Sequence, residues 1–228
     1  MLITGARAGI GKFLARHYAG NGWDVIGISR KPAASELKNV RHFQTDVSDA
    51  GAVARLFSEI RKRYGRLDAL INNAAVKPPV MPALLVPSAL ARQAMEINFL
   101  GAVHVSVEAA KLMMKHRSGR IVNISSMAVR HEARGEAVYT ASKAALTSFT
   151  RTFAKEVYTH GITCNVVAPS AVTTAMMKTV DAEALAAALG QNAVTKPGKL
   201  EDVADAIDFL LSPESRAVTG QVLYLGGA

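Results

Sequence analysis

Short apolar runs alternate with longer helix-like stretches along the whole chain, and this alternation limits the possible folds more than any other feature. Most of the apolar runs are continuous rather than interrupted at every second residue, which is typical of strands covered by helices on both faces. A repeated strand–helix order predicts an α/β protein with a parallel sheet. The expected strands are Met1–Thr4, Val25–Ser29, Val40–Thr45, Ala69–Asn72, Arg120–Ser125, Thr163–Ala168 and Gln221–Leu225.

The stretches between these strands predict helices, and no linker, repeat or low-complexity tract divides the chain. We therefore expect residues 1–228 to form a single doubly wound domain with a parallel sheet of about seven strands. The longest irregular segment, residues 170–198, is interpreted as a substrate lid with a short helix over Ala182–Leu189. Its apolar residues Met176, Met177 and Leu185 suit a flexible cover over a ligand. The other expected helices are Gly11–Gly20, Ala50–Tyr64, Leu90–Lys115, Tyr139–Thr159 and Glu201–Ser212.

The net charge and the cysteine content limit the functional classes to which the chain can belong. A net charge of +9 attracts polyanions in general, but the basic residues are spread along the chain without any zinc-ligand spacing or RNA-binding signature. We therefore expect no nucleic-acid partner and no metal site. The single cysteine, Cys164, excludes an internal disulfide and fits a reducing cytoplasm, and no apolar run is long enough to cross a membrane. A cytoplasmic protein with no membrane partner is expected.

A glycine-rich turn follows the first expected strand and leads directly into the first expected helix. Gly5, Gly9 and Gly11 stand in the spacing Gly-x-x-x-Gly-x-Gly. Glycines allow the backbone to approach a pyrophosphate closely, and a helix N-terminus offers free N–H groups to the anion. An ordinary strand-to-helix turn is the alternative, but the position after the first strand favours a dinucleotide site.

The residues at the end of the second expected strand indicate which dinucleotide the site would bind. A site for NAD would place Asp or Glu there to bind the ribose hydroxyls, whereas this strand ends in Ser29, Arg30 and Lys31. Guanidinium and ammonium groups instead suit a 2′-phosphate, and Arg7 in the glycine loop adds a third cation. Two surface bases after a strand are the alternative. The sequence favours NADP(H).

Tyr139 and Lys143 are four residues apart at the start of an expected helix, so they share one face of it. A free phenol has a pKa of about 10, and a nearby ammonium is expected to lower it towards neutrality. Such a pair can protonate a carbonyl oxygen while hydride arrives at the carbon, or catalyse the reverse reaction. The spacing alone occurs by chance in many helices, but Ser126 stands thirteen residues before Tyr139, and Asn98 stands further upstream.

Further motifs complete a pattern over essentially the whole chain. Asn72-Asn73-Ala74-Ala75 closes one expected strand and Asp46-Val47 closes another. With these motifs in order, the chain resembles the short-chain dehydrogenase/reductase family. The resemblance implies a Rossmann fold and an oxidoreductase that transfers hydride.

The resemblance also implies roles for four catalytic residues. Tyr139 is similar to the family's acid/base, and Lys143 to the group that lowers its pKa and binds the nicotinamide ribose. Ser126 would hydrogen-bond the substrate oxygen, and Asn98 would hold a water that links Lys143 to solvent. A helix-stabilising polar group is the structural alternative for Asn98.

The remaining implied contacts are with the cofactor. The glycines would hold the pyrophosphate, Asp46 and Val47 would border the adenine, and Pro169, Val172 and Thr174 would bind the nicotinamide carboxamide. A strand-end cap is the alternative for Asp46, and a turn former for Pro169. The full expected set is Gly5, Arg7, Gly9, Ile10, Gly11, Ser29, Arg30, Lys31, Asp46, Val47, Asn72, Ala74, Tyr139, Lys143, Pro169, Val172 and Thr174.

Two positions depart from the family pattern. Ala75 and Ser170 stand where the family usually has glycine. Either change would shift the local backbone if the glycine needed a positive φ.

Within the family, the chain looks most like the 3-oxoacyl-acyl-carrier-protein reductases, notably in KHRSGRIVNISS and FAKEVYTHGITCNVVAPS. This implies a carbonyl substrate on an acidic carrier protein, which a basic rim would attract. The alternatives are a small diffusible alcohol or ketone, such as a hydroxy acid, sugar or steroid-like compound, and a non-catalytic cofactor sensor, which has no need of Tyr139. A homodimer or homotetramer through Leu90–Lys115 and Tyr139–Thr159 is also implied. The proposed rim comprises Lys115, His116, Arg117, Arg120, Arg151, Lys155 and His160, and the loop after Ser126, rich in charge, contains Arg130, His131, Glu132, Arg134 and Glu136.

Overall fold

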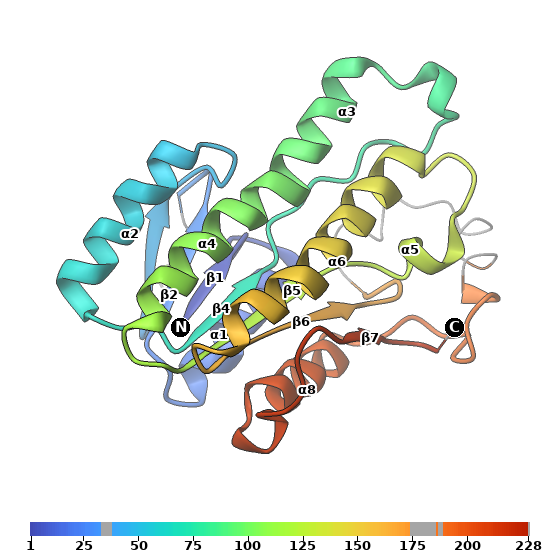
Figure 1. The fold of residues 1–228 in the computed structure, drawn as a ribbon. Helices are drawn as coiled ribbons and strands as arrows, with labels where there is room; N and C mark the ends of the chain where they lie inside the picture. Colours follow the sequence, from blue (N-terminus) through green and yellow to red (C-terminus); the bar gives the residue numbers. More distant parts are fainter. Residues whose placement is uncertain (33–37, 174–185, 187–188, 228) are drawn as a thin grey trace.

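A computed structural model describes residues 1–32, 38–173, 186 and 189–227 of the chain. In these residues seven strands form one sheet in the order β3-β2-β1-β4-β5-β6-β7, with every neighbouring pair parallel (Figure 1). The predicted doubly wound α/β fold is confirmed, and each strand lies within a residue or two of its expected position. The strands are β1 (Leu2–Thr4), β2 (Val25–Ser29), β3 (Val40–Gln44), β4 (Ala69–Asn72), β5 (Gly119–Ile124), β6 (Ile162–Ala168) and β7 (Val222–Tyr224).

Helices cover both faces of the sheet (Figure 1). Helices α1 (Gly9–Gly20) and α8 (Leu200–Leu211) pack on one face. Helices α2 (Ala50–Tyr64), α4 (Gly101–Met114) and α6 (Ala137–Tyr158) pack on the other. Shorter elements outside these layers are α3 (Ser88–Met95), α5 (Ala128–His131) and the 3-10 turns Ala83–Leu85 and Pro213–Ser215.

One expected helix is interrupted. The sequence predicts a continuous helix over Leu90–Lys115, whereas the structure has α3, then a π-helical turn at Glu96–Leu100, then α4. The turn contains Asn98, which is fully buried. Such π-helical turns occur frequently at functional sites because they change which backbone groups are free to bond.

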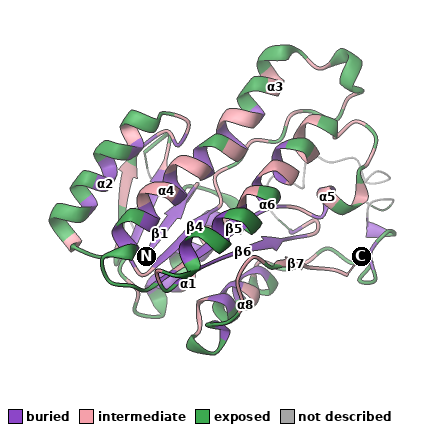
Figure 2. Ribbon diagram, viewed as in Figure 1, coloured by how far each residue is buried: buried purple, intermediate pink, exposed green. Residues whose placement is uncertain are grey.

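The five inner strands are buried on both sides, as their apolar runs predict, whereas the edge strands β3 and β7 are only partly buried (Figure 2). Successive residues point to opposite faces, so Leu2 and Leu70 pack towards α2, α4 and α6, whereas Ile3 and Ile71 pack towards α1 and α8. Each such side chain stabilises the fold by about 1.5–3 kcal/mol relative to full exposure. Two apolar layers therefore fix the sheet between the helices.

The sheet order creates a crevice at one edge. Strands β1 and β4 are neighbours, and the connections run in opposite directions from them, so the loops at their carboxyl ends diverge. The predicted glycine loop, the Asn72-Asn73-Ala74-Ala75 segment and Ser126 all follow strands at this edge. The fold thus gathers the expected site residues where open α/β sheets bind ligands.

Part of the expected lid lies outside the described residues, including Met176, Met177, Leu185 and nearly all of the helix expected over Ala182–Leu189. The described ends of that segment, residues 170–173 and 189–198, are joined through a short parallel bridge between Val172 and Gly198. Along the described ranges, no helix combines the length and apolar character needed to span a membrane.

Candidate active site

The glycine loop is fixed against the end of β4. Gly5 has a left-handed φ of +68°, and a Cβ there would lie 2.9 Å from both the Cα of Ala74 and the Nδ2 of Asn73. The Thr4 hydroxyl oxygen accepts hydrogen bonds from the backbone N–H of Asn73 (2.9 Å) and of Ala74 (2.8 Å), and Asn73 Nδ2 donates to the Thr4 carbonyl (3.0 Å). Thr4 and Asn73 are absent from the predicted site. Asn73 could have been found from its place between Asn72 and Ala74.

Helix α1 begins at Gly9 without a side-chain cap on its first N–H groups. Those N–H groups can therefore bind an anion. Gly9 has a positive φ of +53° and open space around it, whereas a Cβ on Gly11 would overlap the Gly5 carbonyl oxygen. The surface between Gly5 and α1 is thus bare backbone, as a bound pyrophosphate requires. Ile10 lies between the two glycines in the first turn of α1, half-buried against the α1–α8 layer.

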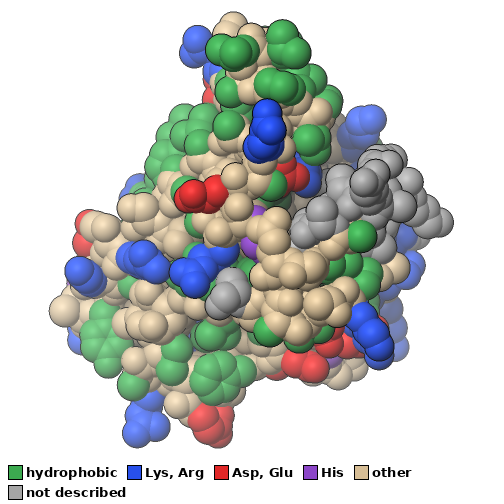
Figure 3. Space-filling model, turned by 90° about the vertical axis from the view of Figure 1, so that its right-hand side faces the viewer, with side chains coloured by type: hydrophobic (Ala, Val, Ile, Leu, Met, Phe, Trp, Pro, Cys, Tyr) green, Lys and Arg blue, Asp and Glu red, His purple; other side chains and the backbone are tan. Residues whose placement is uncertain are grey.

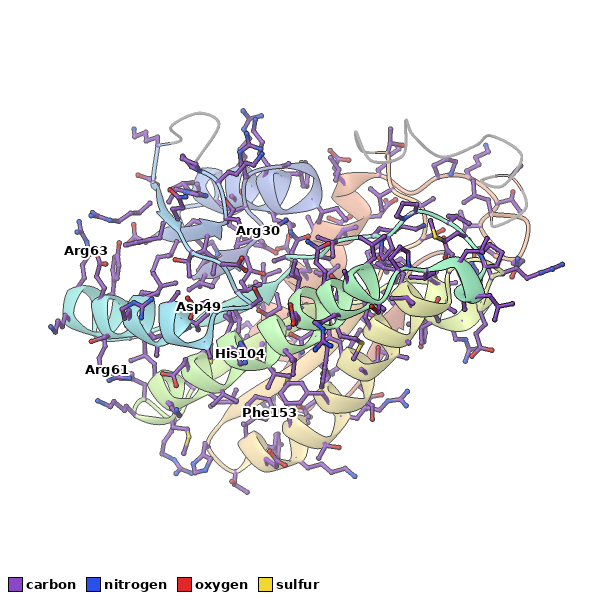
Figure 4. All side chains as sticks on the ribbon, turned by 90° about the horizontal axis from the view of Figure 1, so that it is seen from above. Arg30, Asp49, Arg61, Arg63, His104 and Phe153 are labelled. Carbon is purple, nitrogen blue, oxygen red and sulfur yellow. The ribbon has the colours of Figure 1, made fainter. Side chains whose placement is uncertain are left out.

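Side chains hold the backbone after β2 in place. The Ser29 hydroxyl donates to the Lys31 carbonyl (2.7 Å), and Arg7 Nε donates to the Pro32 carbonyl (3.1 Å). Gln44 donates to the carbonyl of Arg30 (3.0 Å), whose exposed side chain is labelled in Figure 4. The structure therefore places the Arg7 side chain against the backbone that follows β2, where Arg30 and Lys31 are exposed.

The residues around this strand end also include a histidine, His42, that was not predicted from the sequence. His42 lies opposite Gly27 on β3, with its Nε2 2.8 Å from the Ser29 hydroxyl oxygen. Burial, and then the charge of Arg7, lowers the pKa of His42. A neutral imidazole at neutral pH thus supports Ser29 from the side of β3, while the cations face outward.

Lys143 is buried beneath the site. Its Nζ donates to the carbonyl oxygen of Ile124, the last residue of β5, at 2.7 Å. Burial lowers the pKa of Lys143 to about 8. The ammonium therefore stays largely protonated at neutral pH and is fixed between α6 and the carboxyl end of β5.

Tyr139 lies one turn before Lys143 on α6 and interacts with the Ser126 hydroxyl. Burial raises the pKa of Tyr139, the Ser126 hydrogen bond opposes that rise, and the charge of Glu136 adds to it. The expected lowering of this pKa towards neutrality is therefore not found, because the loss of solvent around the phenol outweighs the other influences. The expected proximity of Tyr139 and Ser126 is present.

Asn98 connects three segments around Tyr139. Its Oδ1 accepts from the Val76 N–H (2.7 Å), and its Nδ2 donates to the Val76 carbonyl (2.8 Å) and to the Ser142 hydroxyl (3.0 Å). Ser142 in turn donates to the Tyr139 carbonyl (2.7 Å). The side chain of Asn98 therefore has a structural role, and the water-holding role expected of it stays a prediction.

Three predicted cofactor residues have structural duties. Asn72 donates to Asn123 Oδ1 on β5 (2.8 Å) and to the Ser106 hydroxyl on α4 (2.8 Å). Its side chain therefore lies between the sheet and α4 rather than towards the glycine loop. Asp46 accepts from the Ser48 N–H (3.0 Å) and hydroxyl (2.7 Å), which is the strand-end cap considered as its alternative. Val47 is buried, and its carbonyl lies 3.2 Å from Nδ1 of His104, labelled in Figure 4.

The segment after β6 borders Ser126. The Pro169 carbonyl accepts from the Met127 N–H (3.0 Å), and Val172 is buried, whereas Thr174 lies outside the described residues. Neither Ala75 nor Ser170 has a positive φ; among the described non-glycine residues only Asn39, Arg117 and Glu132 do. Both replacements of the usual glycine are therefore accommodated without backbone strain.

The expected basic rim does not surround the site. Lys115, His116, Arg117 and Arg120 precede or begin β5, and His160 precedes β6, whereas the site follows the carboxyl ends of these strands. In a parallel sheet these are opposite edges, so the cluster cannot line the substrate entrance. These five residues therefore do not support the expected attraction of a carrier protein to the site, and the carrier protein as partner stays a prediction.

Comparison with known proteins finds relatives over the whole chain. A model of the family described as short chain dehydrogenase matches residues 1–185. The 3-oxoacyl-[acyl-carrier-protein] reductase FabG of Escherichia coli (strain K12) is 31% identical over 232 residues, covering 99% of this chain and 95% of that protein. The reductase of the same name from Thermotoga maritima is 35% identical over 237 residues, with the same shares covered.

Two solved structures are similar over their full length. One is described as ElxO with NADP bound; its TM-score is 0.90 at 30% identity, and the match covers 98% of this chain and 95% of that one. The other is xylitol dehydrogenase bound to NAD⁺, with a TM-score of 0.92 at 26% identity, covering 100% of this chain and 97% of that one.

Proposed function

The chain belongs to the short-chain dehydrogenase family, and we propose that it is an NADPH-dependent reductase of a 3-oxoacyl thioester. The observation that carries the reaction class is the juxtaposition of Tyr139 with Ser126 above the buried ammonium of Lys143. A phenol and a serine hydroxyl side by side can share one substrate oxygen, and a cation beneath them favours negative charge there.

Each residue has a distinct part in the proposed reaction. The nicotinamide, when bound, supplies the hydride. Ser126 donates a hydrogen bond to the substrate carbonyl oxygen and orients it towards Tyr139. Tyr139 delivers its phenolic proton to that oxygen as negative charge develops there. Lys143 stabilises the phenolate left behind, and its lowered pKa, about 8, suits a group that takes part in proton resupply near neutral pH.

The choice of NADPH is supported by the cations after β2. Arg7 contacts the segment that carries Arg30 and Lys31, where an NAD site would carry a carboxylate, and a similar structure is that of ElxO with NADP bound. We expect NADPH to bind at least tenfold more tightly than NADH, and Arg30→Ala to reduce the difference. Isothermal titration with both cofactors measures this, and equal affinities in the unaltered chain would contradict the argument from the 2′-phosphate.

The 3-oxoacyl substrate is supported by the similarity to the two carrier-protein reductases along 99% of the chain. The same similarity supports an acidic acyl carrier protein as partner. Because most of the expected basic rim lies at the opposite end of the strands, carrier recognition would depend on residues nearer the site, such as Arg130 in α5 and Arg134 in the loop before α6.

A second candidate is a dehydrogenase of a small polyol or ketone. The observation in its favour is the likeness to xylitol dehydrogenase over the full length of both chains. That protein binds NAD⁺ according to its description, so a preference for NADH by this chain would favour the second candidate over the first.

A screen of NADPH consumption tests the proposal. The substrates are acetoacetyl groups on an acyl carrier protein and on a small thiol, with simple ketones and polyols alongside. We expect the thioesters to be reduced fastest, and Tyr139→Phe to abolish turnover while cofactor affinity stays nearly unchanged. Activity retained by Tyr139→Phe would show that another group is the acid, and exclusive use of polyols with NAD⁺ would identify the second candidate.

We also propose a homodimer or homotetramer through α4 and α6, as the family resemblance implies. Both helices end in exposed apolar residues, Met114 and Tyr158. Sedimentation equilibrium of the purified chain would measure the assembly, and a monomer at micromolar concentration would refute it.

A further inference from the structure

An ion pair stands beside Tyr139 that none of the motifs includes. Lys77, in the loop after β4, places its Nζ 2.6 Å from Oε1 of Glu136 and 5.4 Å from the centre of the Tyr139 ring. Glu136 is the N-cap residue of α6, three positions before Tyr139. The side chains of Lys77 and Glu136 are only 29% and 16% exposed, so water screens their charges less than it would at an open surface.

The surrounding backbone holds this pair in place from both sides. Val76, the residue before Lys77, has both its N–H and its carbonyl bonded to the side chain of buried Asn98. Further along the same loop, the Met81 N–H donates to the Gly135 carbonyl at 3.0 Å, just before Glu136. The two loops therefore meet at an ion pair and at a backbone hydrogen bond, with the Tyr139 ring beneath the ammonium.

A glycine makes this approach possible. Gly135 has a φ of +86°, and a Cβ there would lie 2.7 Å from Cγ1 of Val80. A side chain at this position would separate the two loops, and with them Lys77 from Glu136. The close contact belongs to this chain's own loop sequence, because the segment from Val76 to Met81 lies outside the motifs of the phosphate loop and the catalytic helix.

The two charges act on the phenol in opposite directions. A carboxylate near a phenol disfavours the phenolate, and a cation over the ring favours it. The charged groups that face Tyr139 in the described residues are Lys77 from the β4 loop, and Glu136 and Lys143 from α6. Glu136 raises the pKa of Tyr139, and the ammonium of Lys77 lies both on the Glu136 carboxylate and over the ring, so loss of either charge would shift the proton equilibrium of the phenol.

We propose that Lys77 and Glu136 form a positioning pair that fixes the β4 loop against α6 and balances the charge beside the proton donor Tyr139. This inference rests on the proposed function for the part played by Tyr139, but the electrostatic balance exists without substrate. Lys77 and Glu136 thus tune proton transfer through Tyr139.

The first test is the titration of Tyr139 in the chain without substrate. Tyrosinate absorbance is followed against pH, and the curve of Tyr139→Phe is subtracted to isolate this residue. We expect Glu136→Gln to lower the midpoint, Lys77→Met to raise it, and the double variant to lie between them. Lys77→Arg should restore the original midpoint, because it keeps the charge. The matched control is Lys111→Met, which breaks the ion pair with Glu108 on α4, remote from the ring, and should change nothing.

The second test is the pH profile of kcat/KM for carbonyl reduction, with thermal unfolding confirming that each variant is folded. On the limb of the profile where the phenol loses its proton, kcat/KM at a fixed pH should be roughly threefold to tenfold lower for Glu136→Gln and should be higher for Lys77→Met. Midpoints that move in the same direction, or not at all, in folded variants would overturn the inference. Absence of reductase activity would overturn the proposed function alone, because the absorbance titration still reports the balance of charges.

Discussion

The glycine loop offers the sharpest test of the structure because its three glycines are needed for different reasons. Gly5 combines a positive φ with crowding by Ala74 and Asn73, Gly9 has the positive φ alone, and Gly11 has the crowding alone. A non-glycine residue in the left-handed region costs about 1–2 kcal/mol. Inserting a methyl group where packed atoms must move costs about 1–3 kcal/mol. The three alanine variants therefore separate strain from crowding.

We expect Gly9→Ala to destabilise the chain by about 1–2 kcal/mol and Gly5→Ala by about 2–5 kcal/mol. Gly11→Ala gains about 1 kcal/mol of helix propensity, which offsets part of its crowding, so its net effect is about 0–2 kcal/mol. For a domain of this size, 1 kcal/mol corresponds to about 2–4 °C in Tm. Gly5→Ala should thus unfold at a temperature several degrees below Gly9→Ala.

Calorimetric melting and NADPH titration of the three variants provide the assay. Gly5→Ala and Gly11→Ala should both lose cofactor affinity, because each must move the loop or the Asn73 side chain that borders it. Gly9→Ala should keep a better-formed loop. Equal Tm values for Gly5→Ala and Gly9→Ala would refute the close packing of the loop on the end of β4, whatever their activities.

Asn98→Ala leaves the N–H and the carbonyl of Val76 without their partner. We expect the free energy of unfolding, measured in urea, to fall by about 2–4 kcal/mol and kcat to decrease. An unchanged free energy of unfolding would show that water replaces these hydrogen bonds. Lys143 binds its proton less tightly in the folded chain than in the unfolded one, so between its pKa of about 8 and 10.5 the unfolded state holds more protons and stability should rise with pH. This contribution should reach about 3 kcal/mol and vanish in Lys143→Met, which melting curves across that pH window measure.

The strands were predictable because a strand buried on both faces is mainly apolar along its length, as β1, β4 and β6 are. The interruption of the expected helix at Glu96–Leu100 was not predictable. A π-helical turn adds one residue to the hydrogen-bonded ring, while the apolar residues of the sequence continue through Ile97. The available signal was a buried amide, Asn98, among apolar neighbours. A single polar residue in a helix does not by itself reveal whether it binds backbone or ligand.

The positions of the proposed catalytic residues were predictable because their spacings are local. Tyr139 and Lys143 need only the geometry of one helix, and Ser126 needs only the end of one strand. Lys77 was missed because its partner becomes visible only once the loops after β4 and before α6 meet. The basic rim was misplaced for a related reason. A strand rises by about 3.3 Å per residue, so Arg120, at the start of β5, lies far from Ser126 despite being close in sequence.

The segment between β4 and α3 contains apolar residues that do not pack against the sheet. Val80, Leu84 and Leu85 are strongly exposed in the segment before α3, which forms the upper end of the molecule in Figure 3. This segment continues directly from Val76 and Lys77, which the site holds by hydrogen bonds and an ion pair. One end of the loop is therefore fixed by the site, and the other end is free of the core.

Residues 73–77 connect the glycine loop to Tyr139, the proposed proton donor. Asn73 bonds to the backbone around Gly5, Val76 is bonded to Asn98, and Lys77 reaches Glu136 beside Tyr139. A displacement at either end must therefore stretch polar contacts at the other, because each contact joins this short segment to a rigid element. It follows that Asn73→Ala, which touches no reacting group, should weaken cofactor binding and also alter the pH dependence of Tyr139, whereas an effect on binding alone would show that the two halves of the site are independent.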